Sequence, residues 1–332
     1  MPALTQHRTR GCAHARPAAG ARPLPARQPA YGKAAAGEEP LPAAGMRLAG
    51  RYRLDHRIGG PDWSSEWMGT DELLGRPVTV RVFRSGPVPD VVMAAVRNAG
   101  RLTDPRLARI YDSGDEAGRP YLVSECAPGT SLGDLLASDL PSPALAVTIT
   151  AQAAAALAVA HAAGQPHLCL SPELVRWNSD GVKITGLGIE AALRGMLPGV
   201  TAAQAAAADT RALAGVLYAL LTGYWPGDEA TSLPPAPRHR GLVHLPGQIR
   251  PGVPAILDEI ICRALLPGTS MQEQITTPGQ LAHALNSVRG LRLHPVPLPE
   301  RASGPARRPS SAPAASAASA RPARRPSLAP AA

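Results

Sequence analysis

The chain has 332 residues, of which 45% are hydrophobic, so it is long and apolar enough to bury a sizeable core. Aromatic residues make up only 3% and include a single Phe, so that core must be built from Leu, Val, Ile and Ala. The formal net charge of +9 would ordinarily favour nucleic acid or an anionic membrane as a partner, and the distribution of the charge decides whether it does.

The excess positive charge lies at the two ends of the chain. Residues 1–45 carry six basic side chains against two acidic ones, a net +4, and residues 293–332 carry six against one, a net +5. Both segments are rich in Ala, Pro and Arg and lack hydrophobic periodicity, so we predict disordered basic tails. Residues 46–292 are therefore neutral overall, which argues against a specific nucleic-acid-binding face and leaves only weak, salt-screened membrane contact through the tails. Met46 opens the patterned region and is a candidate translation start.

The four cysteines are far apart and show no Cys-x-x-Cys or Cys/His spacing, so no metal site is predicted and reduced thiols are expected. No stretch has the pattern of a signal peptide or a membrane span. The longest apolar run, over 144–164, is mostly Ala and is interrupted by Thr, Gln and His. We therefore expect a cytoplasmic protein.

The first half of the patterned region favours strands. Two alternating segments flank a turn after Arg51, and a helix is expected over 90–103, where Val and Ala recur at helical spacing. Further strands are predicted over 77–82, 107–111 and 121–125, the last two around a Gly-Asp-Glu-Ala-Gly turn.

The second half favours helices. They are predicted over 131–136, 143–163, 209–221, 256–266 and 278–288. Among them lies the stretch 167–190, HLCLSPELVRWNSDGVKITGLGIE, in which residues 174–177 and 182–185 predict a β-hairpin around Asn-Ser-Asp-Gly.

This stretch resembles the catalytic core of a bacterial serine/threonine protein kinase, where a His-Arg-Asp-Leu-Lys-Pro-Glu-Asn loop precedes such a hairpin and Asp-Phe-Gly follows it. The resemblance covers about residues 46–292 and implies an α+β, two-lobed protein-kinase-like fold. A small β-rich N-lobe would span about 46–127 and a larger helical C-lobe about 128–292. Four matching residues would be structural, namely His167, Leu187, Gly188 and Asp209, the last of which would bind the catalytic-loop backbone.

The same alignment places unreactive side chains where a kinase carries its chemistry. Cys169 stands in place of the catalytic Asp, and Leu174 and Gly186 replace the two metal-binding residues. The strand-three lysine is Arg81, and the helix glutamate that should pair with it is Ala95. Because phosphoryl transfer depends on these groups for positioning and charge stabilisation, we expect no catalytic residue, no metal and no cofactor.

The resemblance also marks a vestigial ATP cleft. Its phosphate loop would begin at Gly59, but Pro61 and Ser64 replace the other glycines, and proline also lacks a backbone N–H. The remaining positions are Glu66, where a small apolar residue normally covers adenine, Thr79, the gatekeeper Ser124, and Glu125 in the hinge.

The resemblance and its departures together predict a pseudokinase that serves as a docking or regulatory scaffold. Family analogy implies protein partners, among them phosphothreonine-binding modules and cell-envelope proteins. Two alternatives stay open: an atypical phosphotransferase that uses Arg81, Glu173 and Asp180 as substitutes, and a degraded remnant, which the intact hydrophobic patterning disfavours.

Three further side chains have competing interpretations. Cys169 is expected to be inert rather than a nucleophile, because nothing in the sequence supplies a base or a lowered pKa. Trp63 and Trp67 flank the phosphate loop, and a core role and a partner-contact role are equally compatible with the sequence.

Overall fold

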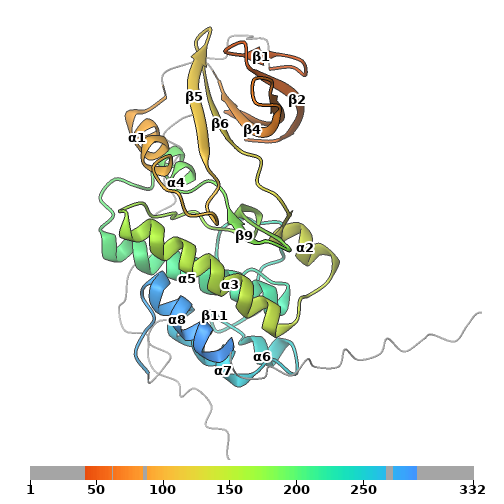
Figure 1. Cartoon of the computed structure of the whole chain (residues 1–332). Coiled ribbons are helices and arrows are strands. Elements are labelled where there is room, and N and C mark those ends of the chain that lie inside the picture. Colours follow the sequence, from red (N-terminus) through yellow and green to blue (C-terminus); the bar gives the residue numbers. More distant parts are fainter. Residues whose placement is uncertain (1–41, 62, 85–87, 267–271, 290–332) are drawn as a thin grey trace, which may run out of the picture. The chain divides into compact units, whose positions relative to one another are not determined.

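A computed structural model describes residues 42–61, 63–84, 88–266 and 272–289 (Figure 1). The predicted tails lie outside the described residues, apart from 42–45. There, the Gly45 N–H donates to the Leu54 carbonyl at 2.7 Å, so backbone pairing with the sheet begins just before Met46.

Six antiparallel strands form one sheet in the order β1-β2-β3-β4-β6-β5. Successive side chains of β4 point to opposite faces of the sheet. Val78, Val80 and Val82 are buried in one apolar cluster. Thr79 and Arg81, which lie between them, therefore face the other side. The strands are β1 (Arg47–Leu48), β2 (Tyr52–Gly59), β3 (Ser64–Asp71), β4 (Arg76–Phe83), β5 (Ile110–Glu116) and β6 (Arg119–Glu125).

Two elements of this part differ from their predicted bounds by three residues or more. Helix α1 (Asp90–Ala99) ends at Gly100 and does not continue to residue 103. Strand β5 begins at Ile110 and runs on to Glu116, because the reversal of the chain is made by Ala117 and Gly118 alone, with φ of 53° and 80°. Glycine adopts such positive φ values at low cost, which places the turn at this point.

The helical part is built around α3 and α5, which pack together and share a large core of Ala, Leu, Val and Ile (Figure 1). Helix α3 is apolar all round, as expected for a helix surrounded by its neighbours. Its length and composition would also suit a membrane span, but 61% of its apolar 18-residue stretch is buried in the fold. The helices are α2 (Leu132–Ser138), α3 (Pro143–Ala162), α4 (Ile189–Leu193), α5 (Ala202–Thr222), α6 (Pro246–Ile249), α7 (Ala255–Leu265) and α8 (Pro278–Arg289).

The predicted hairpin is confirmed as β8 (Val175–Asn178) and β9 (Gly181–Ile184). The Asn178 side chain accepts hydrogen bonds from the backbone N–H groups of Asp180 and Gly181, which closes the turn. A third short strand, β7 (Thr130–Ser131), joins β8 on its other edge. A third sheet, formed by the two strands β10 (Arg238–His239) and β11 (Leu242–Val243), was not predicted.

Helix α5 starts one residue after Thr201, well before the predicted start at residue 209. Thr201 and Gln204 form a reciprocal capping box, in which each side chain binds the backbone N–H of the other residue. The alanines that follow have the highest helix propensity of any residue, so they continue the helix to Asp209.

Candidate functional site

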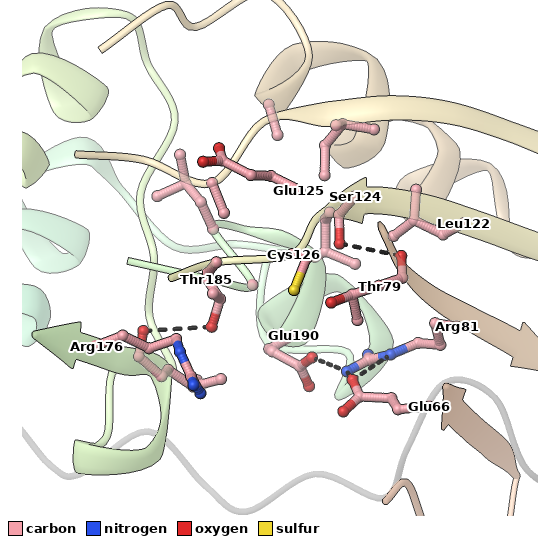
Figure 2. A pocket seen from close by; sticks show the side chains of 18 of the residues that line it. Glu66, Thr79, Arg81, Leu122, Ser124, Glu125, Cys126, Arg176, Thr185 and Glu190 are labelled. Atoms are coloured by element: carbon pink, nitrogen blue, oxygen red, sulfur yellow. Dashed lines mark hydrogen bonds and ion pairs between the residues drawn. The ribbon is translucent and has the colours of Figure 1, made fainter. Parts of the chain in front are cut away.

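A cavity of about 450 Å³ lies where the Thr79 and Arg81 face of the sheet meets the β8–β9 hairpin and α4 (Figure 2). Four residues assigned to the vestigial cleft line it, namely Glu66, Thr79, Ser124 and Glu125. The cavity is also lined by Arg81, Leu174, Gly186 and Leu187 from the predicted site. The structure therefore brings together the two ends of the site, which are more than 100 residues apart in the chain.

Three residues assigned to the vestigial cleft, Gly59, Pro61 and Ser64, do not line this cavity. The Ser64 N–H donates to the Pro61 carbonyl at 3.0 Å, which folds the loop back on its own strand. Gly60, with φ of 108°, lies so close to this strand that a Cβ would come 2.6 Å from the Ser64 carbonyl oxygen. As a result Gly59 and Pro61 stay clear of the cavity, and the Ser64 side chain is buried.

Arg81 is held between two carboxylates (Figure 2). Glu66 lies directly opposite it across the β3–β4 ladder and binds it through Nε at 2.9 Å and also through Nη2. Glu190 approaches from α4, with its Oε1 2.5 Å from Nη2. Burial lowers the pKa of Arg81, but the charges of Glu190 and Glu66 outweigh it and hold the pKa above its ordinary value. The guanidinium is therefore permanently charged, with Nε and Nη2 paired and Nη1 buried without a hydrogen-bond partner.

Glu190 is a site residue that the sequence analysis missed. It belongs to α4, whose five residues are all buried and which packs against α1. Ala95, at the position of the missing helix glutamate, lies in an apolar cluster with Ile189 and Leu193. The small Ala95 side chain thus leaves room for α4, which supplies the carboxylate that α1 lacks. The only signal in the sequence was an acid two residues after Gly188.

Gly186 also makes room for Glu190. Its φ is 74°, and a Cβ at this position would lie 2.9 Å from Glu190 Cγ and 3.6 Å from Leu174 Cδ2. Any larger residue would combine an unfavourable backbone conformation with a contact that displaces Glu190. The glycine at this position is therefore required by the new ion pair.

Lys183, the only lysine among the described residues, makes a second ion pair beside the cavity. Its Nζ lies 2.7 Å from Glu125 Oε1, so β9 is linked to the end of β6. The other Glu125 oxygen accepts the Arg109 N–H at 3.1 Å. The hinge carboxylate is thus fully engaged by the protein.

Asp209 fixes the loop that precedes the hairpin, as the resemblance implied. Its fully buried carboxylate accepts the backbone N–H groups of His167 and Leu168 at 2.7 and 2.6 Å, and His161 Nε2 lies 2.7 Å away. Leu168 has a positive φ of 61°, a conformation that costs energy for a residue with a side chain. The hydrogen bonds to Asp209 offset this strain.

His167 is buried within the same loop. Its Nε2–H donates to the Thr185 carbonyl at 3.0 Å, and its Nδ1 accepts the Cys169 N–H at 3.3 Å, so both ring nitrogens are used by a neutral imidazole. Burial lowers the pKa of His167, which keeps the ring neutral. His167 is therefore a structural residue in this fold.

Cys169 lies close to Met196, with the two sulfur atoms 3.4 Å apart. Burial raises the pKa of its thiol to about 12, so the thiolate that nucleophilic chemistry requires is scarce at neutral pH. Its side chain does not line the cavity. The inertness of Cys169 stays a prediction, and both its burial and its raised pKa favour it.

The two acids proposed as substitutes for the kinase machinery do not converge. Glu173 lines the cavity, but its Oε1 accepts from the N–H and the hydroxyl of Ser232 at 2.8 and 2.7 Å. Burial acts to raise the pKa of Glu173, but these donors and Ser171 lower it overall. Asp180 is exposed in the β8–β9 turn and lies outside the cavity lining. Among the described residues, no group of three or more His, Cys, Asp or Glu could hold a metal ion.

The two tryptophans beside the phosphate loop have different surroundings. Trp67 is 6% exposed in the sheet core, so it is a core residue. Trp63 is half-buried and stacks on Phe83, with ring centroids 6.4 Å apart and ring planes at 7°.

Comparison with known sequences identifies relatives that are named as serine/threonine-protein kinases, although no family model matches the chain. The chain is 30% identical over 309 residues to the serine/threonine-protein kinase PknA of Mycobacterium tuberculosis, which covers 82% of this chain and 70% of PknA. It is 31% identical over 243 residues to PknL of the same organism, covering 65% and 61%. The probable serine/threonine-protein kinase CE0033 of Corynebacterium efficiens is 30% identical over 206 residues, covering 53% of this chain and 31% of that protein. The chain therefore spans about a third of CE0033 and under two thirds of PknL.

Solved structures share the fold. The PpkA-294 apo form superposes with a TM-score of 0.58 at 16% identity, covering 74% of this chain and 99% of that one. Rad53 1–466 in complex with AMP-PNP gives a TM-score of 0.52 at 20% identity, covering 71% and 64%. The sheet followed by a helical part, the loop held by Asp209 and the sequence relatives all agree: the chain belongs to the bacterial serine/threonine protein kinase family.

Proposed function

We propose that this chain is a catalytically inactive member of the family that serves as a cytoplasmic docking or regulatory scaffold. The observation that carries the proposal is the state of Arg81, whose guanidinium is bound by Glu66 and Glu190. A phosphate that approached Arg81 would meet the negative charge of both carboxylates, and the guanidinium nitrogen that they leave unpaired, Nη1, is buried. Such a site favours internal pairing over a polyphosphate.

A magnesium–nucleotide complex does not fit the residues present. Mg²⁺ prefers carboxylate and water oxygens in an octahedral arrangement. Of the carboxylates that line the cavity, Glu66 and Glu190 bind Arg81, Glu125 binds Lys183 and Glu173 binds Ser232. Gly186 and Leu174 offer no metal ligand at the positions where a kinase has two.

The intact frame supports a role that depends on shape. Asp209 holds the loop, and the core around α3 and α5 is continuous. A chain that had lost its function would be expected to accumulate polar or cavity-forming substitutions in the core as readily as in the site. The partners proposed are proteins, with phosphothreonine-binding modules and cell-envelope proteins as the first to examine, on family analogy.

An atypical serine/threonine phosphotransferase is the second candidate, because the sequence relatives are named as serine/threonine kinases. Its acids would have to come from Glu173 and Asp180, of which only Glu173 lines the cavity.

Radiolabel transfer from ATP to the chain itself and to a generic protein acceptor separates the two candidates. We expect no transfer with Mg²⁺ or Mn²⁺ under conditions in which PknA is active. A thermal-shift series with ATP and MgCl₂ should give no saturable stabilisation, whereas a ligand present at about a hundredfold above its Kd would add about 2.7 kcal/mol to the free energy of unfolding. Transfer that depends on Glu173 would favour the enzyme and exclude the inactive scaffold.

A further inference from the structure

We propose that two ion pairs, Arg81–Glu190 and Lys183–Glu125, form an interlobe clamp that holds the sheet against the helical part without a bound ligand. The inference goes beyond the inactive-scaffold proposal, because it concerns how the cleft is kept in one conformation. It rests on that proposal only in taking the cleft to be free of a magnesium–nucleotide complex.

Each pair joins one element of the sheet to one element that follows the catalytic-type loop. Arg81 in β4 binds Glu190 in α4, and Glu125 at the end of β6 binds Lys183 in β9. A single such contact would act as a pivot, but two contacts on separate strands and separate partners also oppose rotation.

The backbone adds a third point of attachment close to Lys183. The Ala108 N–H donates to the Ile184 carbonyl at 2.8 Å, and the Ile184 N–H donates to the Arg106 carbonyl at 2.7 Å. This bridge connects β9 to the segment that leads into β5. The clamp pair at Lys183 therefore lies next to a backbone contact that restricts the same opening motion.

The side chains of both pairs are largely shielded from water. Exposure is 13% for Arg81 and 10% for Glu190, and 15% for Lys183 and 18% for Glu125. Charges shielded in this way attract each other more strongly than exposed ones and are screened less by salt. The exposed pair between Arg47 in β1 and Glu72, which directly follows β3, has an arginine that is 56% exposed and provides a comparison that involves neither α4 nor β9.

The substitutions around the cleft fit this clamp as a set. Gly186 and Ala95 provide the space that Glu190 and α4 occupy, and Glu66 steadies Arg81 from within the sheet. Independent loss of catalytic residues would not be expected to produce a matching partner for Arg81. The departures from the kinase pattern are therefore consistent with one rearrangement.

The lysine content allows a direct test. Lys33 and Lys183 are the only lysines in the chain, so an amine-acylating reagent followed by mass spectrometry measures clamp opening at Lys183, with Lys33 as internal reference. In the full chain, Glu190→Gln should raise the Lys183/Lys33 labelling ratio roughly five-fold, as expected when a local opening equilibrium loses a shielded charge pair. Glu190 does not bind Lys183, so this effect would show that the two pairs open together.

Two further variants bracket the result. Glu125→Gln removes the partner of Lys183 itself and should raise the ratio at least as much, whereas Glu72→Gln breaks the exposed pair with Arg47 and should leave it unchanged. If Glu190→Gln melts as cooperatively as the unmodified chain measured beside it but the ratio stays the same, the clamp proposal is wrong. Should that variant fail to fold, Glu190→Asp, which shortens the side chain by one methylene, is measured in the same way with the same two outcomes.

The experiment is independent of the test of function. Phosphate transfer by a chain with protected Lys183 would refute the inactive scaffold and leave the clamp. If Lys183 is unprotected and the chain transfers no phosphate, the clamp is refuted and the inactive scaffold stands.

Discussion

The loop anchor at Asp209 and the ion-pair network at Arg81 are both shielded charged sites, but they differ in what they bind. Asp209 binds backbone N–H groups, which are present whatever the side chains of the loop are. Arg81 binds only side chains, Glu66 and Glu190. A backbone-directed network is thus kept when the loop sequence changes, whereas a network of side chains can be rebuilt from different residues. This explains why the anchor matches the kinase pattern and the cleft does not.

The largest loss of stability is expected for Asp209→Ala. It would leave the backbone N–H groups of His167 and Leu168, and His161, without their acceptor, and the strain at Leu168 would no longer be offset. Removal of a fully buried charged partner costs about 3–5 kcal/mol, which should be measured as a fall in the free energy of unfolding by urea denaturation. Asp209→Asn keeps one acceptor oxygen and should lose less. Equal stability of Asp209→Ala and the unmodified chain would show that the anchor does not hold the loop.

A smaller loss is expected for Arg81→Leu, which leaves Glu66 and Glu190 facing each other without a cation. Because the site retains some exposure, we expect a cost of about 2–3 kcal/mol in urea unfolding, less than for a fully buried pair. Adding Glu66→Gln and Glu190→Gln should recover most of it, since the repulsion is then removed. A triple variant no more stable than Arg81→Leu would mean that the network acts through packing and not through charge.

Restoring two kinase residues by Cys169→Asp and Gly186→Asp should give no phosphoryl transfer, because Arg81 stays paired and Leu174 and Ala95 supply no ligand. The double variant should also be less stable, by about 1–3 kcal/mol at position 186 alone, since Asp would adopt φ of 74° against Glu190. Radiolabel transfer and thermal unfolding measure both effects, and Gly186→Ala separates backbone strain from charge repulsion. Robust transfer by the double variant would favour the enzyme.

The smallest expected effect is a pH dependence from His167. Its pKa is lowered by burial, so the folded chain binds fewer protons than the unfolded chain, and stability falls as the pH drops below about 6.5 towards the folded pKa. The slope should reach at most about 1.4 kcal/mol per pH unit. Urea unfolding at a series of pH values between 7.5 and 5 should show a flatter profile for His167→Gln, which keeps a donor for the Thr185 carbonyl. Parallel profiles would assign the pH dependence to other groups.

Local patterns predicted most of the fold. The Asn-Ser-Asp-Gly turn, the helices at 143–163 and 278–288 and the sheet strands have short-range signals that the structure confirms within a few residues. The early start of α5 had a local signal as well, the Thr201 and Gln204 capping box before the alanines.

The pairing within the cleft could not be predicted in the same way. Glu66 opposite Arg81 follows from strand register, but the spacing of 109 residues between Arg81 and Glu190 carries no pattern. Which acid meets Arg81 depends on the position of α4, and that position depends on Ala95 and Gly186 together. The sequence shows that the kinase residues at these positions are replaced, but only the three-dimensional structure shows that Arg81 and Glu190 form an ion pair.

The uninterrupted helix from Ala202 to Asp209 limits which insertions and deletions this segment can accept during evolution. Each residue of an α-helix turns the chain by about 100° and advances it by about 1.5 Å. Gain or loss of a single alanine in the run from Ala205 to Ala208 would therefore rotate the Thr201 cap, and the segment from α4 that enters it, about the α5 axis while Asp209 stays fixed to its loop. The length of this run acts as an angular register between the anchor and α4, so we expect insertions and deletions to be tolerated far less here than substitutions among small helix-forming residues.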